Sequence, residues 1–201
     1  MKTIVFDLGN VVAFFDHRRA LERIRPFSPL SVEEMYARVF AGDLEDRVER
    51  GQLTPSVFLR EVHHLWQLRC DVEFLAHALG DIFSANPEVC DLVPRLKARY
   101  RLVLGSNTNA VHARRFLAQF AGVLRHFDTL VLSHEIGTRK PDAEFFHTCQ
   151  RLAKAKASEC VFIDDLQANI DGARGVGFHG IVYRPNAGLA AQLQALGVEA
   201  A

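Results

Sequence analysis

Short apolar runs alternate with longer amphipathic stretches from about residue 86 onward. The apolar runs lie at 101–104, 129–132, 160–163 and 180–183, and the amphipathic stretches lie around 88–99, 110–120, 142–154, 168–175 and 187–196. The short runs have the length of buried strands, and the longer stretches have the periodicity of helices. One more apolar run, at 4–6, precedes them. The pattern predicts an α/β fold, in which helices cover both faces of a parallel sheet.

Residues 17–84 break this alternation, because no stretch within them reads as a buried strand and signals for helix starts are dense. These signals are the Ser31 to Glu34 capping box, the Thr54-Pro55 pair and Asp71. Such side chains accept hydrogen bonds from the first N–H groups of a helix, and proline suits its first position. We therefore expect a core of residues 1–16 and 85–201, with residues 17–84 inserted as a small helical cap.

Composition and charge describe an ordinary globular chain of 201 residues, with 49% hydrophobic and 24% charged residues. The 24 basic side chains balance the 24 acidic ones, and the sequence pI is about 7.1. A balanced surface gives no electrostatic case for binding nucleic acid or an anionic membrane, so any phosphate site must be local. No feature of the sequence predicts an oligomeric state.

The sequence also indicates a cytoplasmic protein. No apolar run has the length of a membrane span, and the N-terminus leads straight into the first apolar run rather than into a signal peptide. The four cysteines are Cys70, Cys90, Cys149 and Cys160. Their wide spacing favours reduced thiols over a zinc site or a disulfide framework.

Carboxylates follow two of the apolar runs. The run at 4–6 ends in Asp7, and the run at 160–163 ends in Asp164 and Asp165. If the two runs are neighbouring parallel strands, three acidic groups converge at one sheet edge. Such a cluster repels itself unless it is protonated or bridged by a cation, and hard carboxylate oxygens suit Mg²⁺. The pattern predicts a metal-assisted site that handles phosphate.

Four short motifs now coincide with a known family. They are Asp7-Leu8-Gly9-Asn10-Val11, Ser106-Asn107, Lys140-Pro141 and Asp164-Asp165, in that order. Together they resemble the signature motifs of the haloacid dehalogenase (HAD) superfamily, whose fold is a Rossmann-like parallel sheet. The resemblance covers essentially the whole chain, with residues 17–84 matching the helical cap after the first motif. Each motif alone is weak, but four in order at strand ends are specific.

The resemblance implies that Asp7 is a nucleophile that attacks phosphorus and forms an aspartyl-phosphate. It also implies a Mg²⁺ ion held by Asp7, the backbone carbonyl of Gly9 and Asp165. Asp164 is expected either just outside the metal ligands or as the group that orients Lys140.

The remaining motifs are expected to bind the phosphoryl group. Ser106 and the amide of Asn107 would hold its oxygens, and Lys140 would offset the charge of the carboxylates and the phosphate. Taken singly, each residue also fits a plain reading as a cap, a turn or a solvated loop residue.

Gly9 departs from the usual family pattern. Most phosphatases of the superfamily carry a second Asp there as general acid and base, a role that typically contributes about 10²–10⁴-fold. The Asp-x-Gly-Asn-Val variant resembles a branch of sugar-phosphate phosphatases of the glucose-1-phosphate type. Asp16 is our candidate substitute, with an N-cap as its alternative role. Arg50, in a turn resembling one in the caps of this branch, is a candidate substrate contact, with a solvated arginine as the alternative.

We therefore expect a Mg²⁺-dependent phosphomonoesterase that acts on a small phosphorylated metabolite such as a sugar phosphate. One alternative is a metal-independent 2-haloacid dehalogenase, an enzyme class that also lacks the second Asp of the first motif. The doubled carboxylate Asp164-Asp165 argues against it. The other alternative is a non-catalytic phosphate-binding module that lost its general acid and base.

Overall fold

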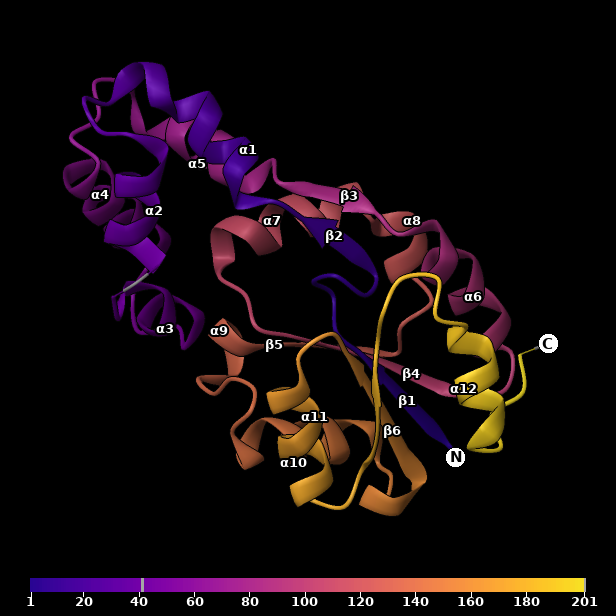
Figure 1. Cartoon of the computed structure of the whole chain (residues 1–201). Coiled ribbons are helices and arrows are strands. Elements are labelled where there is room, and N and C mark those ends of the chain that lie inside the picture. The colour runs from indigo at the N-terminus through magenta and orange to yellow at the C-terminus, as the bar shows by residue number, and fades with distance from the viewer. Residues whose placement is uncertain (41, 201) are drawn as a thin grey trace.

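The computed structural model describes residues 1–40 and 42–200, apart from the side chain of Phe40. A five-stranded sheet in the order β5-β4-β1-β6-β7 forms the centre of the molecule, and all its strands are parallel (Figure 1). The strands are β1 (Thr3–Phe6), β4 (Arg101–Ser106), β5 (Thr129–Leu132), β6 (Cys160–Asp164) and β7 (His179–Val182). The predicted α/β class and its parallel sheet are confirmed.

Helices cover both faces of this sheet (Figure 1). One face is covered by α6 (Pro87–Lys97), α7 (Ala110–Gln119), α8 (Ala121–Leu124) and α12 (Leu189–Ala195), and the other by α10 (Ala143–Ala153) and α11 (Gln167–Gly175). The short helix α9 (Ser133–Ile136) follows β5, and a 3₁₀ turn, η2 (Ala157–Glu159), precedes β6. The sheet is thus enclosed in the way that parallel sheets require.

Burial on both faces explains why the central strands contain consecutive apolar residues. In β1, Ile4 and Phe6 belong to the larger apolar cluster, while Val5 between them belongs to the smaller cluster that contains Phe145 and Phe162. Successive side chains of a strand point to opposite faces, so a strand with helices on both faces needs apolar residues throughout.

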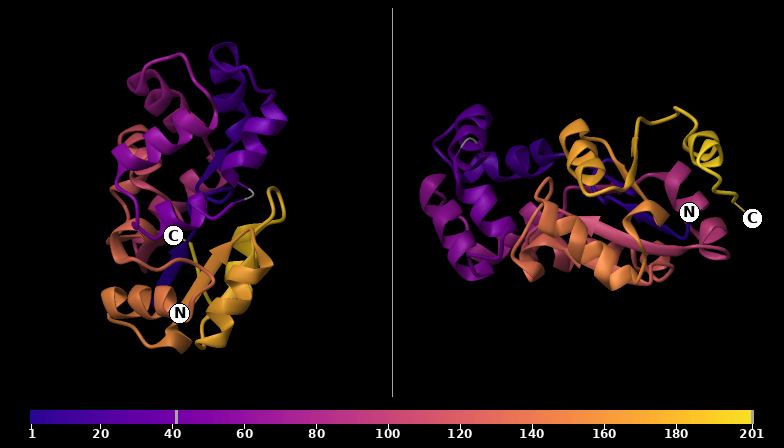
Figure 2. Two further views of the ribbon diagram at one scale, coloured as in Figure 1. Left: turned by 90° about the vertical axis from the view of Figure 1, so that its left-hand side faces the viewer. Right: turned by 90° about the horizontal axis from the view of Figure 1, so that it is seen from below.

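The expected helical insert forms a second layer of structure beyond one end of the sheet (Figures 1 and 2). It contains α1 (His17–Ile24), η1 (Arg25–Phe27), α2 (Val32–Phe40), α3 (Leu44–Glu49), α4 (Pro55–Leu65) and α5 (Val72–Gly80). The chain enters through β2 (Ala13–Phe15) and returns through β3 (Phe83–Ala85), which pair as antiparallel strands. We call residues 17–84 the cap and the rest the core, and their division into two domains stays a prediction.

The predicted capping residues begin three cap helices. Ser31 and Glu34 exchange hydrogen bonds of 2.8 and 3.1 Å between side chain and backbone. The Thr54 hydroxyl accepts from the N–H of Val57, and Asp71 accepts from that of Phe74. No helix among the residues that the structure describes is long and apolar enough to cross a membrane.

Gly51 is a point of close contact between cap and core. Its backbone has a φ of +67°, and a Cβ atom there would overlap the backbone carbonyl oxygen of His134 in α9. Only glycine combines this conformation with so close an approach. The turn after α3 therefore fixes the distance between the cap and α9.

We predict that Gly51→Ala destabilises the protein more than Gly137→Ala. Gly137 has a similar φ of +73°, but a Cβ atom there would meet nothing within 4 Å. Gly137→Ala should therefore cost only the left-handed conformation, about 1–2 kcal/mol. Gly51→Ala adds the overlap with His134, roughly 1–3 kcal/mol more. Urea unfolding of both variants measures the difference, and equal losses would show that this contact does not hold the cap in place.

Candidate active site

The motif residues meet at the carboxyl ends of the central strands. Asp7 directly follows β1, Ser106 ends β4 and Asp164 ends β6. Since β1 lies between β4 and β6, these three side chains converge at one edge of the sheet. This edge, where the strand order reverses, is where open α/β sheets bind their ligands.

Lys140 lies between two of these carboxylates. Its Nζ atom is 2.7 Å from Asp7 Oδ1 and 2.8 Å from Asp164 Oδ2, and the residue is only 2% exposed. The side chain of Asn107 holds its backbone: Oδ1 accepts from the Lys140 N–H at 2.8 Å, and Nδ2 donates to the Lys140 carbonyl at 3.0 Å. Asn107 thereby fixes the loop that delivers the lysine.

Asp164 is a fully buried carboxylate with both oxygens engaged. Oδ1 accepts from the backbone N–H of Leu166 at 2.8 Å, and Oδ2 accepts from Lys140. The amide of Asn169, in the first turns of α11, donates to both oxygens at 3.0 Å. Asp164 therefore forms a buried ion pair with Lys140, and a role in orienting that lysine stays a prediction.

Asp7 and Asp165 keep oxygen atoms suited to a cation. Among the described residues, one oxygen of each carboxylate accepts hydrogen bonds from other residues. Leu8 and Lys140 donate to Asp7 Oδ1, and Asn10 donates to Asp165 Oδ2. One oxygen from each of Asp7, Asp164 and Asp165 lies within 4.8 Å of the other two. Three carboxylates and one ammonium carry a net charge of −2 when ionised, which matches one divalent cation.

Burial dominates the electrostatics of this cluster. It raises the pKa of the Asp7 carboxyl far above its usual range, an effect that Lys140 opposes and the neighbouring Asp164 and Asp165 reinforce. Burial alone would lower the pKa of Lys140, but Asp7 and Asp164 outweigh it and raise that pKa. The ammonium stays charged, and additional positive charge would favour ionised carboxylates. The donor set, all hard oxygens, fits Mg²⁺.

The position of the absent second Asp is filled by an aromatic ring. A Cβ atom on Gly9 would lie 2.9 Å from Cε1 of Phe15, the last residue of β2. No side chain fits at residue 9 unless that ring moves. The backbone carbonyl of Gly9 as a metal ligand stays a prediction, and a side chain at this position would require the Phe15 ring to shift.

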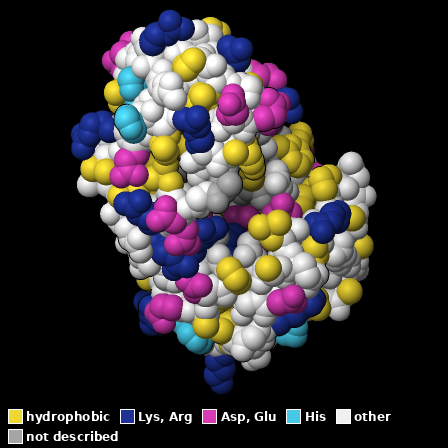
Figure 3. All heavy atoms as spheres, turned by 60° about the vertical axis from the view of Figure 1, so that its left-hand side comes forward, with side chains coloured by type: hydrophobic (Ala, Val, Ile, Leu, Met, Phe, Trp, Pro, Cys, Tyr) yellow, Lys and Arg dark blue, Asp and Glu magenta, His cyan; other side chains and the backbone are white. Residues whose placement is uncertain are grey.

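A cavity of about 90 Å³ adjoins the site and is lined by both core and cap. Its core residues include Gly9, Ser106 and Asn107, and its cap residues include Glu45 and Glu49 of α3. Viewed as spheres, the protein has a hollow between cap and core with acidic and basic side chains around it (Figure 3). The predicted phosphate-binding residues Ser106 and Asn107 thus face a cavity next to Asp7.

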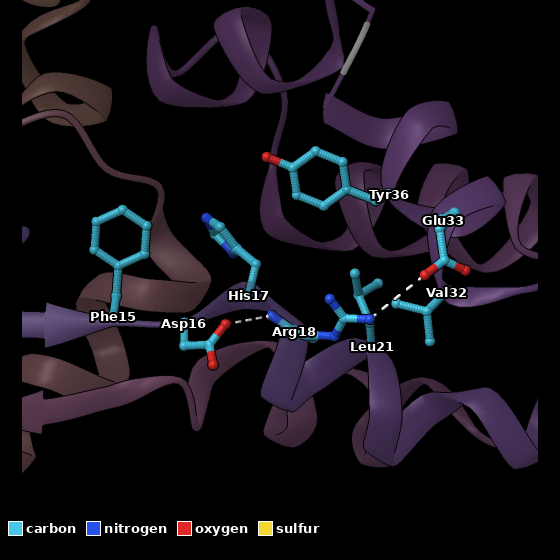
Figure 4. A pocket seen from close by; sticks show the side chains of 8 residues that line it. All are labelled: Phe15, Asp16, His17, Arg18, Leu21, Val32, Glu33 and Tyr36. Carbon is cyan, nitrogen blue, oxygen red and sulfur yellow. Dashed lines mark hydrogen bonds and ion pairs between the residues drawn. The ribbon is translucent and has the colours of Figure 1, made fainter.

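Asp16 lies outside this cavity. Its Oδ1 accepts from the backbone N–H of Arg18 at 2.9 Å, so that it caps α1 as the alternative reading had it. It lines a neighbouring hollow of about 520 Å³ together with Phe15, His17 and Tyr36 (Figure 4). A role for Asp16 in proton transfer stays a prediction.

Arg50 joins the cap to the core rather than pointing into the cavity. Its Nε donates to Asp46 at 2.9 Å, and its Nη1 donates to Asp142 at 2.6 Å, two residues after Lys140. Arg139 completes the contact with ion pairs to Asp46 and Glu49. A substrate contact by Arg50 stays a prediction, since two carboxylates already hold its guanidinium.

Sequence reasoning gave no role to several residues of the site. Asn10, with a φ of +54°, is part of the first motif. Asn169 follows Asp164 closely enough in sequence for its side-chain amide to reach that carboxylate. Both could have been suspected from the motifs. Phe15 and Glu49 reach the site because of how the cap and its connecting strands fold against the core. No local sequence pattern reveals that arrangement.

The sequence of this chain matches known proteins. Residues 1–177 match the haloacid dehalogenase-like hydrolases, and the chain belongs to this family. It is 24% identical over 194 residues to the D-ribitol-5-phosphate phosphatase of Bacteroides thetaiotaomicron, a match that covers 94% of this chain and 93% of the relative. A phosphatase of Mycobacterium tuberculosis is 29% identical over 189 residues, covering 88% of this chain and 84% of the relative.

Solved structures give the same fold. A variant of a HAD family enzyme from Bacteroides thetaiotaomicron, in complex with magnesium and inorganic phosphate, matches with a TM-score of 0.85 and 22% sequence identity. The match covers 96% of this chain and 98% of that one. The predicted family and fold are thereby confirmed.

Substitution of the two adjacent aspartates should separate their roles. Asp165→Asn should weaken Mg²⁺ binding, because a charged ligand becomes neutral. Asp164→Asn should affect Mg²⁺ affinity less but lower the unfolding free energy, since Lys140 loses a buried partner and unpaired buried charge is costly. Calorimetric Mg²⁺ titration and urea unfolding measure both effects. Wild-type Mg²⁺ affinity in Asp165→Asn, with a large loss in Asp164→Asn, would reverse the assignment.

Proposed function

We propose that this hydrolase is a Mg²⁺-dependent phosphomonoesterase that acts through an aspartyl-phosphate on Asp7. The observation that carries the proposal is the position of Lys140, buried between Asp7 and Asp164, with Asp165 beside them. A cluster that places a nucleophilic carboxylate among cations suits a dianionic phosphate ester, whose charge would otherwise repel the attacking carboxylate. The phosphatases among its relatives support the same function.

In this mechanism, the Asp7 carboxylate attacks the phosphorus atom while Lys140 orients it. The hydrogen bond from the Leu8 N–H and the contact with Lys140 both fall on Asp7 Oδ1 and fix the position of the carboxylate. Ser106 and the backbone amide of Asn107 would bind phosphoryl oxygens. Mg²⁺ held by Asp7, the Gly9 carbonyl and Asp165 would neutralise the phosphate and orient it for attack.

The substrate in this proposal is a small phosphorylated metabolite such as a sugar or sugar-alcohol phosphate. The hollow of about 520 Å³ shares Phe15 and His17 with the smaller cavity beside Asp7 (Figure 4). It has room for the organic part of such a substrate, and its mixture of aromatic and charged side chains suits a polyhydroxylated one. We place the protein in the cytoplasm, in keeping with its four free cysteines.

The dehalogenase alternative differs in its need for a cation. A metal-independent enzyme has no use for Asp165, which is only partly buried and shares the cluster with Asp7. Activity toward phosphate esters that EDTA abolishes and Mg²⁺ restores would therefore favour the phosphatase. Activity toward a 2-haloacid that is unchanged by EDTA would favour the dehalogenase.

The test is a screen of the purified protein against phosphorylated metabolites in the presence of Mg²⁺. Asp7→Asn should lower phosphatase activity to background while leaving the fold intact, because it removes the attacking charge and keeps the shape of the side chain. Release of inorganic phosphate measures activity, and circular dichroism checks the fold. Near wild-type turnover in Asp7→Asn would exclude Asp7 as the nucleophile.

The screen also tests the non-catalytic alternative. A binding module would bind phosphate or Mg²⁺ without turning over any ester, whereas the proposed enzyme releases phosphate from at least one member of the panel. Aryl phosphates belong in the panel, because their leaving oxygen needs no proton and they report on nucleophilic attack alone.

A further inference from the structure

Phosphate monoesters of ordinary alcohols need a proton on the leaving oxygen, and the first motif cannot supply it. Gly9 has no side chain, Phe15 fills the space beside it, and the Asp16 carboxylate caps α1 outside the cavity. Lys140 is held between two carboxylates. Another group that lines the cavity is therefore a candidate for the proton donor.

Glu49 is a carboxyl group that the cap places in this cavity. It is the last residue of α3, the helix that Gly51 positions against α9 of the core. Its side chain is 13% exposed and lines the cavity opposite the core residues Gly9 and Ser106. Cap and core thus bring a carboxyl group to a cavity whose wall includes Gly9 of the first motif and the predicted phosphate ligand Ser106.

The contacts of Glu49 leave it able to react. Arg139 Nη2 lies 3.0 Å from its Oε2, but the geometry is not that of a hydrogen bond. This oxygen is buried and has no hydrogen-bond partner among the described residues. The Arg139 contact holds this oxygen by charge, and the Glu49 residue still lines the cavity.

Its environment also favours the protonated form near neutral pH. Burial raises the pKa of Glu49 to about 7 against the opposing effects of Arg139 and Lys140, and Glu45 and Asp46 raise it further. A group with a pKa near the working pH can both give and take a proton. His17 and His112 line the same cavity, but burial lowers their pKa values to about 4 and about 3. They are therefore neutral at pH 7 and are weak proton donors.

We propose that Glu49 of the cap is the general acid and base of this enzyme, in place of the absent second Asp. This inference rests on the proposed phosphatase function. As the bond from the Asp7 carboxylate to phosphorus forms, the bond from phosphorus to the alkoxy oxygen breaks, and the Glu49 carboxyl proton passes to that oxygen. The Glu49 carboxylate then takes a proton from water, whose oxygen bonds to phosphorus as the bond to Asp7 breaks, and inorganic phosphate and free Asp7 result.

Comparison of two substrate types tests this role. Glu49→Gln should lower the turnover of the best alkyl phosphate in the panel by about 10²-fold or more, because the leaving alkoxide stays unprotonated. With saturating p-nitrophenyl phosphate, the rate of the phosphorylation step should change by only a few-fold. Pre-steady-state release of p-nitrophenol measures that rate. Circular dichroism and Mg²⁺ affinity check that the variant folds and keeps its metal site.

Glu45→Gln is the matched control, since Glu45 lies one turn earlier on α3 and lines the same cavity. Any change in that variant should be similar for both substrate types. A selective loss for alkyl phosphates in Glu49→Gln alone supports the assignment. Equal losses for both types, no loss, or a selective loss in Glu45→Gln would overturn it. An inactive wild type would instead overturn the phosphatase function, and an active wild type with unaffected Glu49→Gln would leave that function standing.

Discussion

The ion pairs of Lys140 with Asp7 and Asp164 are the interaction on which the rest of the site depends. All three groups are nearly inaccessible to water, so each charge is tolerable only because the others compensate it. The lysine joins the ends of β1 and β6 and is itself held by the Asn107 side chain beyond β4. Three strands are thereby connected through a single lysine residue.

This interaction also explains the division of labour between the adjacent aspartates. The Asp164 oxygens accept hydrogen bonds from Lys140, from Asn169 and from the backbone N–H of Leu166, just before α11. Asp165, one residue further and partly exposed, has the freedom that a metal ligand needs. A strand end turns successive side chains in different directions, so a doubled Asp can serve both purposes.

The cap is attached to the same loop that carries the lysine. Arg50 bridges Asp46 of α3 to Asp142, and Arg139 reaches back from the core to Asp46 and Glu49. Lys140 lies between these two core residues in sequence. Cap position and lysine position are thus coupled through charged contacts, and movement of α3 would change the place of Glu49 in the cavity that Ser106 also lines.

Much of the fold could be predicted because its signals are local. The strands at 101–104 and 160–163 contain short apolar runs, and Ser31, Thr54 and Asp71 cap helices as expected. The pair β2 and β3 has three residues in each strand, too few for a periodic pattern, and neither was predicted. The packing of Phe15 on Gly9 and the approach of Glu49 to Arg139 join segments that are distant in sequence, so only tertiary structure places them.

The central claim is that Asp7 becomes covalently phosphorylated during turnover. The most direct measurement is rapid acid quenching of wild-type protein mixed with Mg²⁺ and the best substrate of the panel, followed by peptide mapping by mass spectrometry. The account predicts a phosphoryl group on the peptide that contains Asp7, which forms before steady state and is absent from Asp7→Asn. Turnover with rapid phosphate release and no phosphorylated Asp7 peptide at any quench time, or with the phosphoryl group on another residue, would contradict it.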